Sequence, residues 1–298
     1  MAMQRAQFLS LMAEGLRKVF FDHFDELPSV YPQIFDIQKS TKRMETDQTI
    51  AGIGMLSVKP EGEPTIYEDM TEGFSQSAMH TAYSKGIRVS RELIDDDQYN
   101  IINKRTRALA RSAKYRKEWD HAKMFNNAEA TTYFTCGDGL ALLSNSHKLA
   151  ASTTTFDNYA ASTSLSVTAL EAAFNAIRRF PDDNNMLIAL EPNTLLIAPE
   201  LDWDAEEILG STNKPYTADN EKNTMRGRLK IVKWPFLTGT ATWFVLADKG
   251  VIAPVSFNRT PVEFSRDGDF DTDDLKVKVY TRYSLMCLDP RFCYGDVG

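Results

Sequence analysis

Two serines and a histidine stand close together in the stretch SNSH, where a nucleophile and a general base could work as a pair. Ser144, Ser146 and His147 are residue types that catalyse acyl transfer. No Gly-x-Ser-x-Gly sequence surrounds either serine, and neighbours on one loop rarely have the geometry of a catalytic triad. We therefore expect a capped polar turn here. A serine hydrolase in which Ser146 and His147 act together is kept as an alternative.

Three aspartates near the carboxyl end have the spacing of calcium ligands. Asp267, Asp269 and Asp271 alternate along the chain as they do in a calcium-binding loop. However, Gly268 is not at the position where that loop needs its glycine, and Lys278 stands where the bidentate glutamate belongs. We therefore expect an acidic turn without bound calcium.

The histidines and glycines do not indicate a cofactor site. Gly52 and Gly54 lack the third glycine of a dinucleotide-binding loop, and no phosphate-binding loop ending in Gly-Lys-Ser or Gly-Lys-Thr occurs. The four histidines are scattered, with no pair at the spacing of metal ligands: His23, His80, His121 and His147. We expect no catalytic residues, no metal and no cofactor.

The overall composition restricts the class of protein further. The net charge of −7 argues against a dedicated nucleic-acid binder, and 43% hydrophobic residues are ordinary for a globular chain of 298 residues. No run of about 18 apolar residues and no secretion signal is found. The cysteines are odd in number and not at metal spacing, which fits small buried side chains in a reducing environment: Cys136, Cys287 and Cys293.

One long stretch, residues 97–127, organises the chain. It contains neither glycine nor proline, so we expect a helix of about 45 Å, at about 1.5 Å per residue, capped by Asp95, Asp96 and Asp97. Helical spacing places four side chains on one apolar arc, with Ile102, Leu109 and Ala113 beside it: Ile101, Ala108, Tyr115 and Trp119.

The opposite side of this helix is basic. Seven Lys or Arg residues and no Asp or Glu lie between Gln98 and Lys117. Four of them form a stripe at helical spacing: Lys104, Arg107, Arg111 and Lys114. Like charges without interleaved acids repel each other, so we expect this basic stripe to face an acidic partner.

An acidic ribbon precedes the helix. Residues 46–60 and 74–90 are strand-like, and we expect them to form a long two-stranded ribbon with a polar tip. The stretch from Pro60 to Ser84 has no Lys or Arg but five acids: Glu61, Glu63, Glu68, Asp69 and Glu72. An isolated ribbon is marginally stable in water, so it must rest on another surface. We predict that these acids lie on a neighbouring copy, near the basic residues of its helix.

The remaining stretches predict a mixed α/β layer. Residues 4–24 form an amphipathic helix, and the extended LPSVYPQIF follows it; this arm either docks on another molecule or packs on its own domain. A helix capped by Ser166 or Thr168 carries a stripe of Leu170, Phe174 and Ile177. A buried strand at 195–198, a helix from Pro199 to before Gly210, and strands within 229–234, 240–248 and 275–284 follow. Three tryptophans are expected in the core: Trp203, Trp234 and Trp243.

In this order the parts resemble a known family. KGIRVSRELIDDD leads into the long helix, and NTLLIAPELDWDAEEILGS, GRLKIVKWPFLTGTATWFVLADKG and KVYTRYSLMCLDPRFCYG follow it. The chain resembles the major capsid proteins of tailed bacteriophages with the Hong Kong 97-like α+β fold, close to the Mu-like head subunits. The resemblance implies an N-terminal arm (1–45), an extended loop (46–88), a peripheral domain (89–132 and 255–298) with spine helix 97–127, and an axial domain (133–254).

The resemblance also implies a function. A protein of this family is not an enzyme; it self-assembles into pentamers and hexamers that form the icosahedral head around double-stranded DNA. Expected partners are other copies, a scaffolding protein, the portal protein, DNA contacted without sequence specificity, and a decoration protein, but no membrane. The expected location is the virion, after synthesis in the host bacterial cytoplasm. Because only some 45 residues precede the extended loop, a separate scaffold or earlier removal of a scaffolding segment is implied.

Several alternatives stay open. A cellular encapsulin shell has the same fold, and the helix at 4–24 is compatible with a cargo-binding segment. A nucleic-acid-binding module is a third class, and the basic stripe could face DNA or scaffold inside the shell instead of a neighbour. Covalent cross-linking between subunits is not expected, because Lys59 and Lys85 flank the loop and no lysine lies between Pro60 and Ser84.

Overall fold

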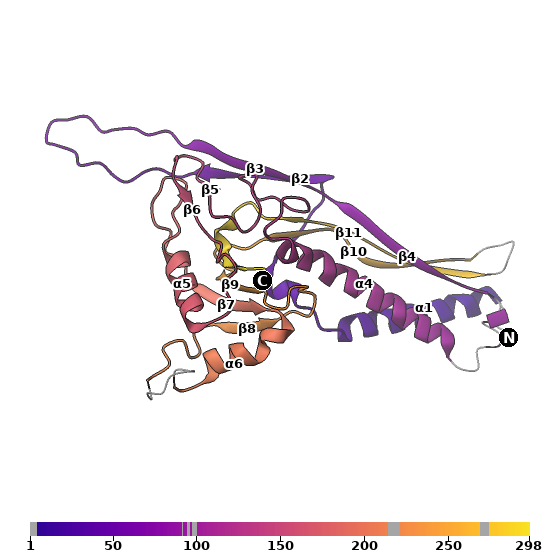
Figure 1. Cartoon of the computed structure of the whole chain (residues 1–298). Coiled ribbons are helices and arrows are strands. Elements are labelled where there is room, and N and C mark those ends of the chain that lie inside the picture. Colours follow the sequence, from indigo (N-terminus) through magenta and orange to yellow (C-terminus); the bar gives the residue numbers. More distant parts are fainter. Residues whose placement is uncertain (1–4, 91, 94–95, 97–99, 214–220, 269–273) are drawn as a thin grey trace.

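The computed structural model describes residues 5–90, 92–93, 96, 100–213, 221–268 and 274–298. Within these residues the strands form two four-stranded sheets and two small two-stranded sheets, and helices pack on the large ones. The α+β fold predicted from the sequence is confirmed. Figure 1 shows an elongated molecule, with a long ribbon projecting at one end and the paired helices α1 and α4 along the other.

The first large sheet joins distant parts of the chain. Its strands lie in this order: β1 (Asp36–Lys39), β10 (Val255–Gly268), β11 (Leu275–Met286) and β4 (Thr81–Val89). β1 is parallel to β10, and the other pairs are antiparallel. Along β11, Leu275, Val277 and Val279 are buried, whereas Lys276 and Lys278 are exposed. This alternation is the one expected for a strand with one face on a core.

Helix α1 (Arg5–Glu26) packs on its own chain, which decides between the two possibilities for the arm. Leu16 and Phe20 are buried, and the ring of Phe20 lies 5.3 Å from that of Phe264 on β10. After α2 (Tyr31–Ile34) the chain enters the first sheet as β1. The segment before the ribbon is therefore part of the domain.

Helix α4 (Ile101–Asn126) lies beside α1 and across the first sheet. Its N-cap is Asn100, with a positive φ of 57°. Of the three expected capping aspartates, Asp95 and Asp97 lie outside the described residues, and Asp96 is exposed.

The buried face of α4 differs from the predicted apolar arc. Ala108 and Tyr115 are exposed, whereas Ile102 and Leu109, which were predicted beside the arc, are buried together with Thr106 and Ala110. The arc was misplaced because Thr106 is polar and Ala110 small, so neither marks a core position by hydropathy. Thr106 can be buried because its hydroxyl donates to the carbonyl of Ile102 at 3.0 Å.

The second half of α4 is held by buried polar groups. Glu118 accepts hydrogen bonds from the Ser29 hydroxyl at 2.5 Å, from the following backbone amide at 3.0 Å, and from the Trp234 indole at 2.8 Å. Two residues further on, Asp120 accepts from the Tyr283 hydroxyl on β11 at 2.7 Å. These bonds connect the helix to the arm and to both large sheets.

The second large sheet lies under two further helices. Its strands lie in this order: β12 (Cys293–Asp296), β9 (Trp243–Ala247), β7 (Pro192–Ile197) and β8 (Lys230–Lys233). β7 continues through the short 3₁₀ turn η1 (Pro199–Leu201) and α6 (Asp202–Gly210) to the parallel β8. β12 falls within the range 255–298 expected for the peripheral domain, yet it pairs with β9 of this second sheet.

Hydrophobic residues fill both sides of the second sheet. On one side Leu196 and Phe244 pack with Phe125 of α4; on the other, Leu195 and Val245 pack with α5 (Val167–Arg178) and α6. The predicted stripe of α5 is buried as expected: Leu170, Phe174 and Ile177. The Ser166 hydroxyl caps α5 by accepting from the backbone amide of Ala169 at 3.1 Å.

The tryptophans do not all behave as predicted. Trp234 and Trp243 are fully buried, but Trp203 exposes 82% of its surface. The expectation for Trp203 was wrong because it occupies the outer face of α6, whose inner face is formed by Ala205, Ile208 and Leu209.

Candidate functional site

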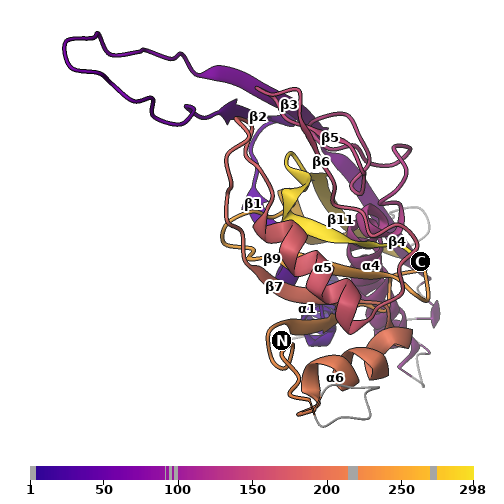
Figure 2. The same cartoon turned by 60° about the vertical axis from the view of Figure 1, so that its left-hand side comes forward.

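The most prominent surface feature is a ribbon that leaves the body of the molecule. β2 (Met44–Ala51) and β3 (Thr71–Met79) pair antiparallel, and residues 52–70 continue beyond them as a loop without strand pairing. Figures 1 and 2 show this loop projecting well past both sheets. The prediction of a long two-stranded ribbon is therefore correct, but its pairing ends at residues 51 and 71, and residues 81–89, expected in the same strand, form β4 of the first sheet. The tip is not the polar one that was expected, because it exposes large apolar side chains.

The five acids predicted to form a contact surface all lie on this ribbon and are exposed. Two of them make bonds across the ribbon: Glu68 accepts from the backbone amide of Gly54 at 3.1 Å, and Glu72 accepts from the Gln48 side chain at 3.3 Å. The other three, Glu61, Glu63 and Asp69, form no ion pair within the described part of the chain. The tip therefore carries negative charge that no described basic residue pairs with.

The loop also carries exposed apolar side chains, which the sequence reasoning missed. Each of the following exposes between 74% and 93% of its surface: Met55, Leu56, Val58, Ile66 and Tyr67. Such a concentration of exposed apolar groups on one segment is typical of an interaction site. The signal in the sequence was a run of large apolar residues inside a segment that charge and proline otherwise mark as a polar turn.

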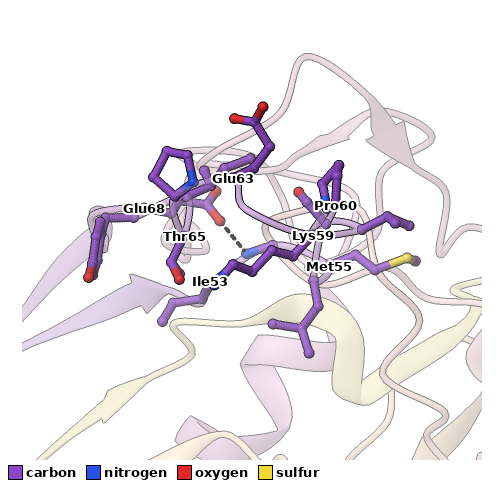
Figure 3. A pocket seen from close by; sticks show the side chains of 14 residues that line it. Ile53, Met55, Lys59, Pro60, Glu63, Thr65 and Glu68 are labelled. Atoms are coloured by element: carbon purple, nitrogen blue, oxygen red, sulfur yellow. Dashed lines mark hydrogen bonds between the residues drawn. The ribbon is translucent and has the colours of Figure 1, made fainter.

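The two arms of the loop enclose a hollow of about 510 Å³. Figure 3 shows its lining, in which Ile53, Met55 and Lys59 come from one arm and Glu63 and Glu68 from the other. The lining comes from the loop alone, and the dashed bond is the one between Glu68 and the Gly54 amide. The lining includes no histidine, serine–histidine pair or cysteine, so it offers no catalytic group of the types considered above.

The base of the ribbon is fixed to the rest of the chain. The Gln76 side chain donates to the Thr135 carbonyl at 2.5 Å, and the Asn184 side chain donates to the Gly52 carbonyl at 2.5 Å. Gly137 lies so close to the ribbon that a Cβ there would be 3.2 Å from the Cβ of Phe74 on β3. The ribbon thus leaves the body in a defined direction.

The basic stripe on α4 is mostly free on the surface. Lys104, Arg107 and Arg111 are exposed. Lys114 is half-buried instead, because its ammonium lies 4.7 Å from the ring centroid of Phe24 on α1 and 3.5 Å from the Phe24 carbonyl. Burial also lowers the pKa of Lys114. Three of the four predicted residues are therefore available to a partner, and the fourth helps to hold α1.

The acidic loop and the basic stripe do not meet within one chain. In both views the loop projects at one end of the molecule, and the first turns of α4 lie toward the other end. A contact between the loop and the stripe would therefore require two molecules.

Ser146 and His147 are not arranged as a nucleophile and base. His147 is fully buried, with Nδ1 at 2.7 Å from an Asp138 oxygen and Nε2 at 3.3 Å from the Leu142 carbonyl. Ser146 is exposed, and its backbone amide donates to the Ser144 hydroxyl at 3.2 Å. The segment is therefore a polar turn in which the Ser144 hydroxyl accepts from the backbone, and His147 is a buried structural residue.

Metal ligands do not cluster in the described part of the chain. No group of three or more His, Cys, Asp or Glu side chains suited to a metal occurs there. Asp267 is on β10, and Asp269 and Asp271 lie outside the described residues. Cys136, Cys287 and Cys293 are buried and unbridged, and burial raises the pKa of the thiols of Cys287 and Cys293. None of the described helices is both long and apolar enough to cross a membrane.

Comparison with known proteins adds a family. A family model described as phage capsid protein matches residues 75–295, most of the chain. No curated protein sequence matches the chain significantly.

Solved structures share the fold. The decorated capsid of bacteriophage JBD30 aligns with a TM-score of 0.55 at 15% identity over 71% of this chain and 92% of that one. The capsid of an empty GTA particle aligns with a TM-score of 0.56 at 12% identity over 91% and 90% of the two chains. A virus-like particle from Pyrococcus furiosus gives 0.54 at 11% identity over 95% and 98%. Because the identities are only 11–15%, these structures show a shared fold alone, which is the Hong Kong 97-like fold.

Proposed function

This chain belongs to the phage capsid protein family, and we propose that its copies assemble into the pentamers and hexamers of an icosahedral head that encloses double-stranded DNA. As a major capsid protein it is structural, and the family and fold imply no catalytic activity. The function depends on contacts between copies.

The main observation that supports this proposal is the projecting loop. It extends beyond its own domain, so burying its apolar groups requires another molecule. Its acids form no ion pair within the described part of the chain, whereas the exposed part of the basic stripe lies toward the other end of the molecule. A surface that matches a different region of an identical molecule favours head-to-tail contacts, which form rings when the rotation between copies closes.

The parts of the chain then take the roles named above. Residues 1–45 act as the arm, 46–88 as the extended loop, 89–132 with 255–298 as the peripheral domain, and 133–254 as the axial domain. Since β12 pairs with β9, the last strand of the peripheral range is shared with the axial sheet.

Further partners follow from the same function. For a closed DNA-filled head we propose a portal protein for DNA entry and a scaffolding protein during assembly, either separate or as a segment removed earlier. The JBD30 capsid is decorated with minor capsid protein trimers, and a decoration protein is proposed here also. The net charge of −7 suits contact with DNA that is weak and non-specific. Synthesis occurs in the host cytoplasm, and the mature protein resides in the virion.

Electron microscopy of the purified protein tests the proposal. We expect icosahedral shells or capsomers, and, in particles from the native source, DNA-filled heads with tails. Small tailless cages filled with protein would instead support the encapsulin alternative, which the family match makes weaker. A protein that stays monomeric at all concentrations, with and without a scaffolding protein, contradicts the proposal.

A further inference from the structure

A single tryptophan stands on the surface of helix α6. Trp203 exposes 82% of its surface, although the chain buries Trp234 and Trp243 completely. Leaving an indole in water forgoes the large gain from its burial, and tryptophan is enriched at the centres of protein interfaces. The position of Trp203 therefore indicates a contact that one copy of the chain cannot make.

The backbone under this indole is held in place. The inner face of α6 packs in the core through Ala205, Ile208 and Leu209. At the start of the helix, the Lys233 ammonium lies 2.6 Å from an Asp202 oxygen. Because its neighbours are fixed, Trp203 projects from a rigid support, which reduces the entropy lost on binding.

The surface around Trp203 is acidic. Residues 199–210 contain five Asp or Glu and no Lys or Arg. Glu200 and Asp204 flank the indole in sequence and are exposed, and neither forms an ion pair with any described residue. The α6 surface, defined here as Glu200, Trp203 and Asp204, is thus apolar at its centre and negative around it.

The segment that follows α6 in the chain carries the opposite charge and lies beside helix α5. Residues 222–247 contain five Lys or Arg and no Asp or Glu. Arg226 and Arg228 are exposed, and neither is paired with an acid of the described chain. The Arg228 guanidinium lies 6.0 Å from the ring centroid of Phe174 on α5. The two arginines also adjoin the C-terminal end of α6, because the Gly227 amide between them donates to the Leu209 carbonyl at 3.0 Å.

We propose that the α6 surface of one copy docks on the arginine surface, Arg226 and Arg228, of the next copy within a capsomer ring. The proposal rests on the self-assembly proposed above and assigns it a second contact, separate from the extended loop. Contact between two α6 surfaces would oppose acid to acid, whereas contact of the α6 surface with the arginine surface of another copy pairs acid with base. The occupant is therefore a second copy of this chain, which presents its arginine surface.

The first test is to remove the indole. Trp203→Ala is compared with Leu187→Ala, which removes another large exposed side chain (70% exposed) from the proposed axial domain. We expect Trp203→Ala to raise the protein concentration needed for capsomer formation about tenfold or more, as measured by light scattering and analytical ultracentrifugation. Leu187→Ala should leave it unchanged. Both variants should keep the thermal midpoint of the unassembled subunit, since neither side chain is buried.

A charge exchange tests which surface is the partner. Asp204→Lys and Arg228→Asp should each impair capsomer formation, and the two together in one chain should restore it. The docking is overturned if Trp203→Ala and Asp204→Lys assemble at the wild-type concentration. If these two variants assemble normally but no longer bind a basic partner protein, the α6 surface binds that protein and not a second copy, which also overturns the docking. Failure of the wild-type chain itself to assemble would contradict the proposed function instead.

Discussion

Glu118 on α4 and Trp234, which follows β8, are joined by a hydrogen bond of 2.8 Å from the indole nitrogen to the carboxylate. Both side chains are buried, and the bond connects the helix on the first sheet with the second sheet. The same carboxylate accepts from Ser29 and from the next backbone amide. One buried carboxylate thus contributes to the relative position of the two sheets.

Glu118→Ala should destabilise the subunit by about 3 kcal/mol, because it leaves the buried Trp234 indole and two partly buried donors without an acceptor. Urea unfolding of the unassembled protein measures this. Glu118→Gln retains a carbonyl acceptor and should cost clearly less. Glu171→Ala, which removes an exposed acid on α5, is the control and should change stability by less than about 0.5 kcal/mol. Equal stability of Glu118→Ala and the control would mean that the hydrogen bonds to Glu118 do not hold the two sheets together.

Lys117 gives stability a dependence on pH. It is buried, and burial lowers its pKa from 10.5 to about 8, with the nearby charge of Lys114 as the second cause. Between these two values the unfolded chain binds more protons than the folded one, so this residue makes stability rise with pH there. Below about pH 8 both states are protonated and the burial penalty is present in full.

Lys117→Met should therefore stabilise the subunit by on the order of 3 kcal/mol at neutral pH. The advantage should shrink as the pH rises from about 8 toward 10.5, where wild-type Lys117 becomes neutral in both states. Chemical denaturation of both proteins at several pH values measures it, and taking the difference removes the contributions of groups that the two proteins share. A difference that stays constant across this window would contradict the assignment.

Gly137 fixes the base of the ribbon by the absence of a side chain. A Cβ at this position would lie 2.6 Å from the Leu288 carbonyl oxygen and 3.2 Å from the Cβ of Phe74. Gly137→Ala should cost about 1–3 kcal/mol in unfolding free energy, since the backbone must shift. Gly250→Ala is the control, because its nearest contact would be an ordinary 3.7 Å to Asp248, and it should be neutral. Equal effects of the two substitutions would show that the base is not tightly packed.

The sequence predicted the elements whose pattern is local and regular. Residues close together in sequence determine three of these features: the alternation along β11, the Ser166 cap of α5 and the absence of helix breakers in 101–126. Pairings between distant strands, such as β1 with β10 and β12 with β9, depend on tertiary packing and were not accessible.

The candidate site divides in the same way. The charge of the loop and of the α4 stripe could be read directly, since charged residues are mostly exposed. Exposure of apolar residues could not, because hydropathy marks Leu56 and Trp203 as core in the same way as it marks Leu170. Lys117 shows the converse, as a charged side chain that packing buries.

The apolar part of the loop should be needed for assembly but not for folding. Leu56 and Val58 each expose more than nine-tenths of their surface, at 93% and 92%. The double change to serine should raise the concentration required for shell formation while leaving the melting temperature of the unassembled subunit unchanged. Val251→Ser, at an exposed site outside the loop, is the control. Normal assembly of the double variant would remove the loop's apolar residues from the interface.

Charge reversal tests whether the acidic loop meets the basic stripe of a neighbour. Glu63 is preferable to Glu68, because Glu68 also accepts a bond from Gly54 within its own loop. Each exposed pair contributes only about 0–1 kcal/mol, but repetition around a shell multiplies the effect. Glu63→Lys and Arg107→Glu should each reduce assembly, most strongly at low salt, and together restore it; sedimentation of shells across a salt series measures both. If Arg107→Glu assembles normally but retains less DNA or scaffolding protein, the stripe faces the interior of the shell, and the pairing with the loop is wrong.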